Sequence, residues 1–490
     1  MNPSLLLIAI LFPIVFSVFI PLIPFKKRAH MEIYIEVIVM ATSVMVFLLL
    51  INRPGELVLI EFTRKVAFAL KVDGMSMVFA GLISILSPIA TLYSFEYMTH
   101  LQREKPFFMF YTMTFGVTLG IAFASNIMTM YFFYELLTLV TVPLVIHTFT
   151  REAVLATRKY IAYSIGGAAL GFIGIVYLVR YGDGSGFVLG GELLGRTAGL
   201  NMNVLLLIYV VALMGFSVKA AMFPFYSWIP DAGVAPTPVT ALLHAVAVVK
   251  AGAFAVIRLT YYCFGTELLR GTWAQMVVMS LAMFTVVFGC SMAVKETHMK
   301  RRLAFSTVSN LSYIIFGATI MTPAGLFGAL CHMVFHAIMK ISGFFCVGSI
   351  MHQTHKNYVH ETDGFGRKMP WVYLAFTVSA LGMMGVPGGC GFISKWYLAQ
   401  AALDSGNKLA WVGAGALLVS ALLTAIYMMT MVIRGFFPEK DFDESKIKDV
   451  RDPGWQMILP LMLFTIAIIV FGVYSTPLTD FLGKVVNGVF

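Results

Sequence analysis

The stretch GFSVKAAMFPFYSWIPDAGVAPTPVTALLHAVAVVKAGAF, residues 215–254, decides the fold. It predicts an apolar helix that contains Lys219, then a break that includes Pro224 and Pro230, and then a second apolar helix that contains Lys250. A lysine near the centre of a membrane helix costs about 2.5–3.5 kcal/mol, so such residues usually face a polar cavity and mark an ion pathway. Non-helical backbone at membrane depth is tolerated only where protein or water satisfies its polar groups. Both features together indicate the core of a membrane transporter.

The whole chain has the composition of a polytopic membrane protein. Of its 490 residues, 59% are hydrophobic and only 12% are charged, and apolar runs of about 20 residues recur from end to end. The net charge of +10 does not indicate a nucleic-acid partner, because the basic residues lie in short loops between apolar runs. The first run lacks basic flanking residues and an A-x-A cleavage site, so we expect a membrane helix there rather than a removed signal.

Apolar runs bounded by charges or by Pro/Gly clusters predict an all-α membrane protein with about 14 transmembrane helices. The predicted helices cover residues 4–24, 32–52, 73–95, 107–124, 126–149, 160–180, 203–222, 238–262, 273–294, 303–321, 325–350, 371–402, 409–434 and 455–475. Asp73 is predicted to cap the third helix. Five cysteines in apolar segments are expected to be small core residues: Cys263, Cys290, Cys331, Cys346 and Cys390.

Lysine and arginine are concentrated in the loops that follow odd-numbered predicted helices, for example in 295–302 and 434–451. Because basic loops stay in the cytoplasm, we expect these loops to be cytoplasmic and both chain termini to lie outside.

A second break is predicted inside the twelfth helix, in GVPGGCGFISKW at 385–396. Proline and clustered glycines unwind a helix, and here they precede Lys395. The residues of this break are Pro387, Gly388, Gly389 and Gly391. Broken helices in corresponding halves point to an inverted repeat with an ion path at the breaks. The predicted division is 1–106 for helices 1–3, 107–262 for the first repeat (helices 4–8), 273–434 for the second repeat (helices 9–13), and 435–490 for a cytoplasmic loop and helix 14.

Glu135, in MYFFYELLTL, is the acidic residue that we predict to lie well inside a membrane helix. A lysine within about 4–6 Å would keep both groups charged, and movement of the carboxylate would change the charge of that lysine. The alternative is a static buried ion pair that holds two helices together. Such a pair stabilises a fold poorly compared with apolar packing.

His332, His336 and Lys340, in CHMVFHAIMK, recur every four residues and form a ladder about 12 Å long on one helical face. Histidine binds or releases a proton near neutral pH, so the ladder is a candidate proton path through bridging waters. The alternative is that one histidine only satisfies a backbone carbonyl. His244 lies six residues before Lys250, about 240° round the helix, and is a further candidate relay residue. A haem site is disfavoured, because both histidines lie on one side.

These residues resemble the antiporter-like subunits of complex I, of membrane-bound energy-converting hydrogenases and of Mrp-type cation/proton antiporters. The resemblance runs from about residue 72 to 434 and rests on YELLT, the motif after Lys219, KAGAF, the histidine ladder and GFISKW. It implies 14 transmembrane helices with two inverted five-helix repeats. It also implies a Glu135–Lys219 pair, a connecting Lys250 and a terminal Lys395. Some family members carry glutamate at the last position, so Lys395 narrows the subtype.

The resemblance implies a proton-translocating subunit of a multisubunit complex-I-like or hydrogenase complex, in the cytoplasmic membrane of a prokaryote. The alternative is a D-like component of an Mrp-type antiporter without redox chemistry, in which Na⁺ is also carried. Both kinds of complex contain a subunit of this type. Expected partners are a further antiporter-like subunit or small membrane subunits, and a redox module. No cofactor, metal site or redox chemistry is expected in this chain. An enzyme acting on lipid or quinone is disfavoured, because no nucleophile–base set is present.

Overall fold

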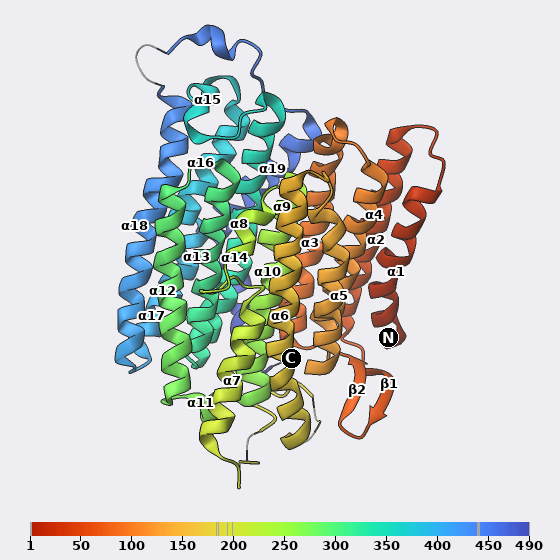
Figure 1. Cartoon of the computed structure of the whole chain (residues 1–490), viewed down its shortest axis with the longest axis vertical. Helices are drawn as coiled ribbons and strands as arrows, with labels where there is room; N and C mark the ends of the chain where they lie inside the picture. Colours follow the sequence, from red (N-terminus) through yellow and green to blue (C-terminus); the bar gives the residue numbers. More distant parts are fainter. Residues whose placement is uncertain are drawn as a thin grey trace.

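The computed structural model of the chain describes residues 2–182, 184, 186–193, 195–197, 199–438 and 442–489. These residues form a bundle of long helices that run roughly side by side (Figure 1). In the described part of the chain, 11 helices are long and apolar enough to cross a membrane. Two shorter apolar helices accompany them, Met202–Ser217 and Pro370–Met384. The predicted polytopic helical membrane fold is therefore confirmed.

The helices follow the order of the predicted apolar runs, although some bounds differ: the helix predicted at 160–180 begins at Arg151, and the run predicted at 371–402 forms two helices. The α-helices are α1 (Ser4–Leu22), α2 (Arg28–Asn52), α3 (Gly74–Tyr97), α4 (Glu104–Phe123), α5 (Ile127–Val145), α6 (Arg151–Tyr181), α7 (Met202–Ser217), α8 (Trp228–Ala232), α9 (Thr237–Ala241), α10 (Val248–Ile257), α11 (Thr266–Leu269), α12 (Trp273–Lys295), α13 (Met299–Thr319), α14 (Pro323–Thr354), α15 (Phe365–Lys368), α16 (Pro370–Met384), α17 (Cys390–Asp404), α18 (Lys408–Phe436), α19 (Trp455–Val473) and α20 (Thr476–Val486). π-Helical turns at Leu242–Val246 and Arg258–Phe264 flank α10.

Several helices begin at a polar side chain that satisfies a free backbone N–H. The Asp73 carboxylate accepts a hydrogen bond from the Ser76 N–H at 2.8 Å, as predicted. Asn126 caps α5 in the same way through the Thr129 N–H at 2.8 Å. All five cysteines are free and buried, which confirms their predicted place in the core.

A two-stranded antiparallel hairpin, β1 (Leu57–Thr63) and β2 (Val66–Leu70), lies between α2 and α3. It sits at the end of the bundle that also carries the N-terminus (Figure 1). The Ala69 N–H donates to the Thr129 hydroxyl at 3.0 Å, which ties the hairpin to α5. The all-α prediction was wrong here, because only runs long enough to cross a membrane were counted and a strand needs about five residues.

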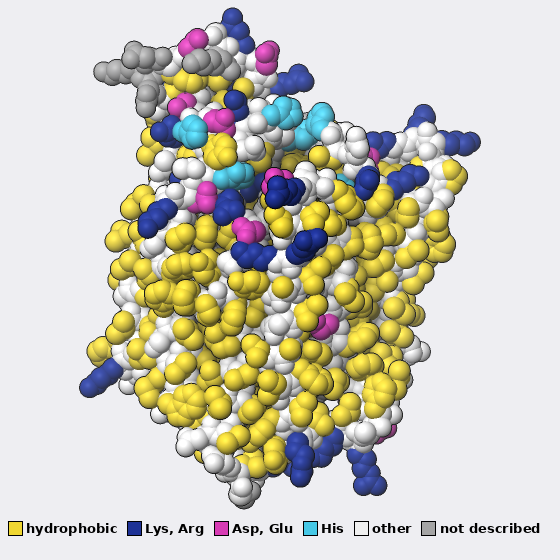
Figure 2. Space-filling model, in the orientation of Figure 1, with side chains coloured by type: hydrophobic (Ala, Val, Ile, Leu, Met, Phe, Trp, Pro, Cys, Tyr) yellow, Lys and Arg dark blue, Asp and Glu magenta, His cyan; other side chains and the backbone are white. Residues whose placement is uncertain are grey.

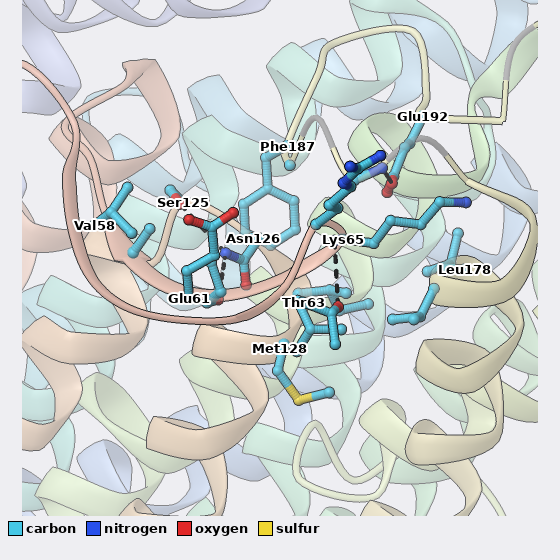
Figure 3. A pocket seen from close by; sticks show the side chains of 18 of the residues that line it. Val58, Glu61, Thr63, Lys65, Ser125, Asn126, Met128, Leu178, Phe187 and Glu192 are labelled. Carbon is cyan, nitrogen blue, oxygen red and sulfur yellow. Dashed lines mark hydrogen bonds between the residues drawn. The ribbon is translucent and has the colours of Figure 1, made fainter.

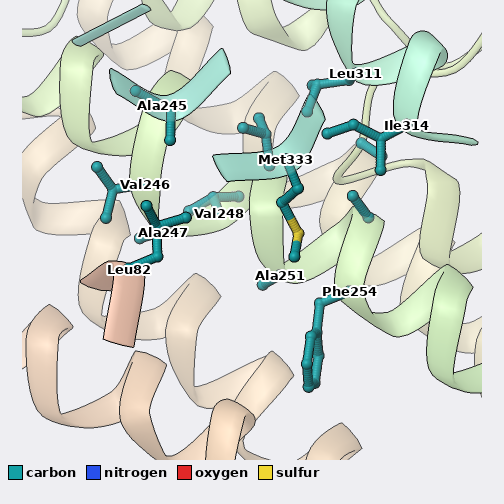
Figure 4. Close-up of a cluster of buried hydrophobic side chains, with 14 of the residues drawn as sticks. Leu82, Ala245, Val246, Ala247, Val248, Ala251, Phe254, Leu311, Ile314 and Met333 are labelled. Atoms are coloured by element: carbon teal, nitrogen blue, oxygen red, sulfur yellow. The ribbon is translucent and has the colours of Figure 1, made fainter. Parts of the chain in front are cut away.

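The centre of the bundle is formed by the segment Thr237–Phe264 and by α14, which are wholly surrounded by other helices. Around them lies a cluster of buried apolar side chains that includes Ala251, Leu311 and Met333 (Figure 4). Small residues let membrane helices approach closely. Because both segments are surrounded by protein, their buried lysines and histidines face protein and not lipid.

Charged side chains gather at the two ends of the molecule and leave a hydrophobic band between them (Figure 2). The end near α15 carries the denser group of basic, acidic and histidine side chains (Figures 1 and 2). This end includes the first turn of α13, where Arg301 pairs with Glu296 in the preceding loop at 3.2 Å and with Asp231 at 3.1 Å. Of the loop predicted from 434 onward, residues 439–441 lie outside the described residues, as do Met1 and Phe490 at the ends of the predicted divisions.

The first break begins earlier than predicted. Helix α7 ends at Ser217, so Lys219 lies in the turn beyond the helix and not inside it. Ala221 has a positive φ of 55°, which an α-helix does not accommodate. Side chains satisfy the freed backbone: the Trp228 indole donates to the Val218 carbonyl at 2.8 Å, and the Phe223 N–H donates to the Thr285 hydroxyl at 3.1 Å. Such partners are what non-helical backbone requires at membrane depth.

Candidate functional site

Glu135 and Lys219 are brought together as predicted. Glu135 lies in the middle of α5, and its Oε1 atom is 3.7 Å from Lys219 Nζ. The lysine side chain is 1% exposed and the glutamate side chain 28% exposed. Lys219 Nζ also donates to the Tyr134 carbonyl and lies 3.4 Å from the centre of the Tyr134 ring. The ammonium group is thus held by one carboxylate, one carbonyl and one aromatic face.

Gly252 on α10 allows the turn that carries Lys219 to pass close to Lys250. A Cβ atom at position 252 would lie 2.9 Å from the Lys219 carbonyl carbon and 3.1 Å from its Cβ. Real Cβ atoms rarely come that close. Lys250 lies two residues earlier on the same helix and is fully buried. The backbone of the first break therefore packs directly against the helix of the connecting lysine.

Lys250 contacts the histidine ladder. Its Nζ atom is 2.5 Å from His336 Nδ1, and both residues are fully buried. A lysine ammonium has donors and no acceptor, so Nδ1 is the acceptor when Lys250 is charged. The two side chains come from α10 and α14, which are 86 residues apart in sequence. The predicted connecting lysine is therefore in direct contact with the predicted ladder.

Further contacts lead from His336 toward the second break. The rings of His336 and His332 stack with centres 5.7 Å apart and planes at 17°. His332 Nδ1 is 2.9 Å from the hydroxyl of Ser394, the residue before Lys395. Tyr313 stacks on His332 at 5.0 Å, and Lys395 Nζ lies 5.3 Å from the centre of the same tyrosine ring.

The second break lies where it was predicted, between α16 and α17, although Gly391 falls within the first turn of α17 and Lys395 lies in the second turn of that helix. Helix α16 ends at Met384 and α17 begins at Cys390. Lys395 Nζ donates to the Met383 carbonyl at 2.7 Å and to the Met384 carbonyl at 3.1 Å. These carbonyls end a helix, where partners are missing and the partial charge is negative.

Glycines make the crossing of α16 and α17 possible. A Cβ atom on Gly391 would overlap the Gly382 carbonyl oxygen, and Gly388 has a φ of 96° that favours glycine. Pro387 and Gly389 complete the turn between the two helices.

Lys340 and His244 lie beside this line and not in it. Lys340 Nζ is 5.7 Å from the centre of the Phe344 ring, and the His244 ring is 5.0 Å from the same ring. Lys340 Nζ and both His244 nitrogens have no hydrogen-bond partner among the described protein atoms. Buried polar groups take water when protein offers no partner. Of the predicted ladder, His336 therefore contacts Lys250 directly and His332 contacts Ser394 directly, whereas Lys340 needs water to join them.

Two kinds of residue escaped the sequence prediction. Ser394 and Tyr313 contact His332, and only the position of Ser394 next to Lys395 gave a signal. Glu36 lies inside α2 with one carboxylate oxygen buried, so Glu135 is not alone among acidic residues well inside a helix, contrary to the prediction. The second helix was predicted to begin at residue 32, which put Glu36 near its start, whereas α2 begins at Arg28.

A separate cavity of about 240 Å³ lies at the hairpin end of the bundle. It is lined by the hairpin, the start of α5 and the segment around Phe187, with Glu61, Lys65 and Asn126 among its polar side chains (Figure 3). None of the predicted site residues lines it.

A helical membrane bundle with two broken helices and a buried lysine–histidine line is the architecture of an antiporter-like membrane subunit. The chain belongs to the NADH:quinone oxidoreductase/Mrp antiporter transmembrane family, whose model matches residues 124–424. Residues 61–108 match a second model, the N-terminus of NADH-ubiquinone oxidoreductase (complex I) chain 5. The predicted family resemblance is confirmed.

Curated relatives come from both branches of this family. The chain is 28% identical over 407 residues to NADH-quinone oxidoreductase subunit N of Desulforudis audaxviator, covering 80% of this chain and 79% of that protein. It is 27% identical over 505 residues to Na(+)/H(+) antiporter subunit A1 of Staphylococcus aureus. That match covers 97% of this chain and 62% of the antiporter subunit, so the chain spans only part of that relative's length.

Solved structures show the same fold. The chain matches a chain of the archaeal membrane-bound sulfane sulfur reductase with a TM-score of 0.85 and 22% identity, covering 99% of this chain and 97% of that chain. It matches a chain of respiratory complex I from Thermus thermophilus with a TM-score of 0.81 and 20% identity, covering 98% of both chains. It also matches a chain of the Mrp complex from Dietzia sp. with a TM-score of 0.82 and 22% identity, covering 98% of this chain and 52% of that chain.

Proposed function

We propose that this antiporter-like subunit translocates protons within a multisubunit ion-pumping membrane complex. The observation that carries the proposal is the row of buried polar side chains that runs from Lys250 through His336 and His332 to Ser394, the residue next to Lys395. This row joins the first helix break to the second one through the middle of the bundle.

The contacts supply what proton transfer needs. A donor and an acceptor must lie within about 2.6–3.2 Å or be joined by one water. Lys250 and His336 meet this distance directly, and so do His332 and Ser394. The two histidine rings, 5.7 Å apart, require one bridging water.

The Glu135–Lys219 pair acts as the switch at the start of this line. The pair can open without breaking the helix, because Lys219 lies in a turn and Glu135 is partly exposed. When the carboxylate moves away, the lysine loses its one charged partner among the described contacts, and its proton becomes available to the next group.

The proposal includes the finer architecture. The broken helices are α7 with α8 and α16 with α17, within two inverted five-helix repeats at 107–262 and 273–434, in a total of about 14 transmembrane helices. The basic end near α15 faces the cytoplasm and both termini lie outside. Other membrane subunits surround the chain, and electron transfer, where the complex performs it, belongs to them.

An Mrp-type Na⁺/H⁺ antiporter is the second candidate function, and the similarity to the subunit named Na(+)/H(+) antiporter subunit A1 supports it. The purified native complex separates the two. Proton uptake by vesicles that requires an electron donor and acceptor supports the redox-driven pump, whereas exchange driven by an imposed Na⁺ gradient alone supports the antiporter. In both cases Lys250→Ala should abolish transport in the assembled complex. Normal transport by Lys250→Ala would refute the proposed path.

A further inference from the structure

A second group of polar side chains lies between α12, α13 and α18, apart from the histidine ladder. Its centre is Cys290, whose sulfur is 3.0 Å from the Ser420 hydroxyl, 3.1 Å from the Ser309 hydroxyl and 3.5 Å from the Thr424 hydroxyl. We call this group, with Ser306 and Tyr427, the hydroxyl–thiol cluster. All of its six side chains are buried.

One end of the cluster reaches toward the basic face of the bundle. The Tyr427 hydroxyl donates to the Ser306 hydroxyl at 2.6 Å and to the Thr424 hydroxyl at 3.3 Å. The Tyr427 carbonyl accepts from Arg302 at 3.0 Å. Arg302 stands in the first turn of α13 beside Arg301, whose side chain is 41% exposed. The cluster thus begins about one helical turn below the surface.

The other end points toward Tyr313, which lies beside Lys395. Ser420 lies three residues after Leu417, whose carbonyl accepts a hydrogen bond from the Tyr313 hydroxyl at 3.1 Å. The Tyr313 ring in turn faces His332 and Lys395. From Arg302 to Tyr313 is eleven residues of helix, or about 16 Å. The cluster therefore lies between the basic face and Tyr313 in the middle of the bundle, with a carbonyl contact at each end, from the Tyr427 carbonyl to Arg302 and from the Leu417 carbonyl to Tyr313.

Hydroxyl groups between membrane helices also serve to hold the helices together, at about 0.6 kcal/mol for each hydrogen bond. Cohesion does not require the groups to form a continuous series along the bundle axis. Here the steps from Tyr427 to Thr424, to Cys290 and to Ser420 are 3.3, 3.5 and 3.0 Å. Among the described contacts, only Cys290 joins the Thr424 hydroxyl to those of Ser420 and Ser309.

We propose that the hydroxyl–thiol cluster is a branch of the proton path that joins Lys395 to the basic face of the bundle. This inference rests on the proposed function. Within the cluster, each O–H or S–H group accepts a proton on a lone pair and passes its own proton to the next group, so no bond to carbon changes. At the two ends, where the contacts run through carbonyl groups that have no proton to pass on, water links Ser420 to Lys395 and Tyr427 to the basic face. Lys395 then exchanges protons with the basic face without the histidine ladder.

The test compares two substitutions of the bridging thiol in the assembled complex, with proton uptake by vesicles as the readout. Cys290→Ala removes the link and should lower transport about tenfold or more. This is less than the 10²–10⁴ typical of a positioned proton donor, because water can partly replace it. Cys290→Ser keeps a donor and an acceptor and should retain most transport. Tyr427→Phe should resemble Cys290→Ala, and Cys346→Ala, a buried thiol outside the cluster, should transport normally.

Each outcome decides the matter. If Cys290→Ala and Tyr427→Phe assemble and transport at the wild-type rate while Lys395→Ala does not, the branch is refuted and the proposed function stands. If Lys395→Ala also transports normally, the proposed function fails with it. Equal losses in Cys290→Ser and Cys290→Ala would show that packing, and not hydrogen bonding, matters at this position, and would also refute the branch.

Discussion

Replacing Glu135 by glutamine tests the switch most directly. The substitution keeps the size of the side chain and removes its charge, 3.7 Å from Lys219 Nζ. With an effective dielectric constant of about 20, two unit charges at this distance attract each other by about 4 kcal/mol. At 1.36 kcal/mol per factor of ten, the ratio of charged to neutral Lys219 should fall by roughly a thousandfold. A switch that depends on this ratio should stop, and proton transport should fall to background.

The assay is proton uptake by vesicles that contain the whole complex, with assembly checked by native electrophoresis. Glu36→Gln is the matched control, because it removes the other carboxylate inside a membrane helix without touching the line. A double substitution, Glu135→Leu with Lys219→Met, separates a switch from a static pair. A static pair replaced by apolar residues should assemble and transport normally. Wild-type transport by that double variant, or by assembled Glu135→Gln, would refute the reasoning.

Three further predictions concern orientation, exit and packing. Cysteine introduced at exposed Thr297 should react with a membrane-impermeant reagent from the cytoplasm only, and cysteine at exposed Glu56 from outside only; the reverse pattern would overturn the proposed orientation. Lys395→Ala should lose most proton transport, whereas Lys395→Glu, which keeps a titratable group, should retain some. Near-normal proton uptake by both variants would show that the path does not end at Lys395. Gly391→Ala should lower the stability of the subunit by about 1–3 kcal/mol in thermal unfolding, because its methyl group overlaps the Gly382 carbonyl. Gly415→Ala, with open space around it, should be neutral, and equal melting of the two variants would contradict this account of the crossing.

The sequence predicted those features that depend on hydrophobic length and on proline and glycine. Both breaks, the buried Lys219 and Lys250, and the His332–His336 ladder could be predicted because each is local in the chain. The hairpin was missed because its strands are shorter than a membrane span. The early end of α7 depends on distant partners, such as Thr285 for the Phe223 N–H, and no local pattern encodes them.

The hydroxyl–thiol cluster was missed for a related reason. Serine, threonine and cysteine are common in membrane helices, where each can bond to its own helix, as Thr424 does to the Ser420 carbonyl at 2.8 Å. Only the packing of three helices turns Cys290 into a bridge, because its partners lie 19 and 130 residues away in sequence. The cluster is thus a property of tertiary structure alone.

The proposed proton path is rich in basic groups and poor in carboxylates, since Glu135, which pairs with Lys219, is the one acid in contact with it among the described residues. Each proton that enters such a path adds positive charge to the buried interior, where two unit charges about 10 Å apart repel by about 1.7 kcal/mol at an effective dielectric constant of 20. A proton already on the path therefore disfavours the binding of a second one nearby. The number of protons that the path holds in each cycle is then limited by electrostatic repulsion and not by the number of titratable groups. Each proton that enters the path favours the release of another proton further along it.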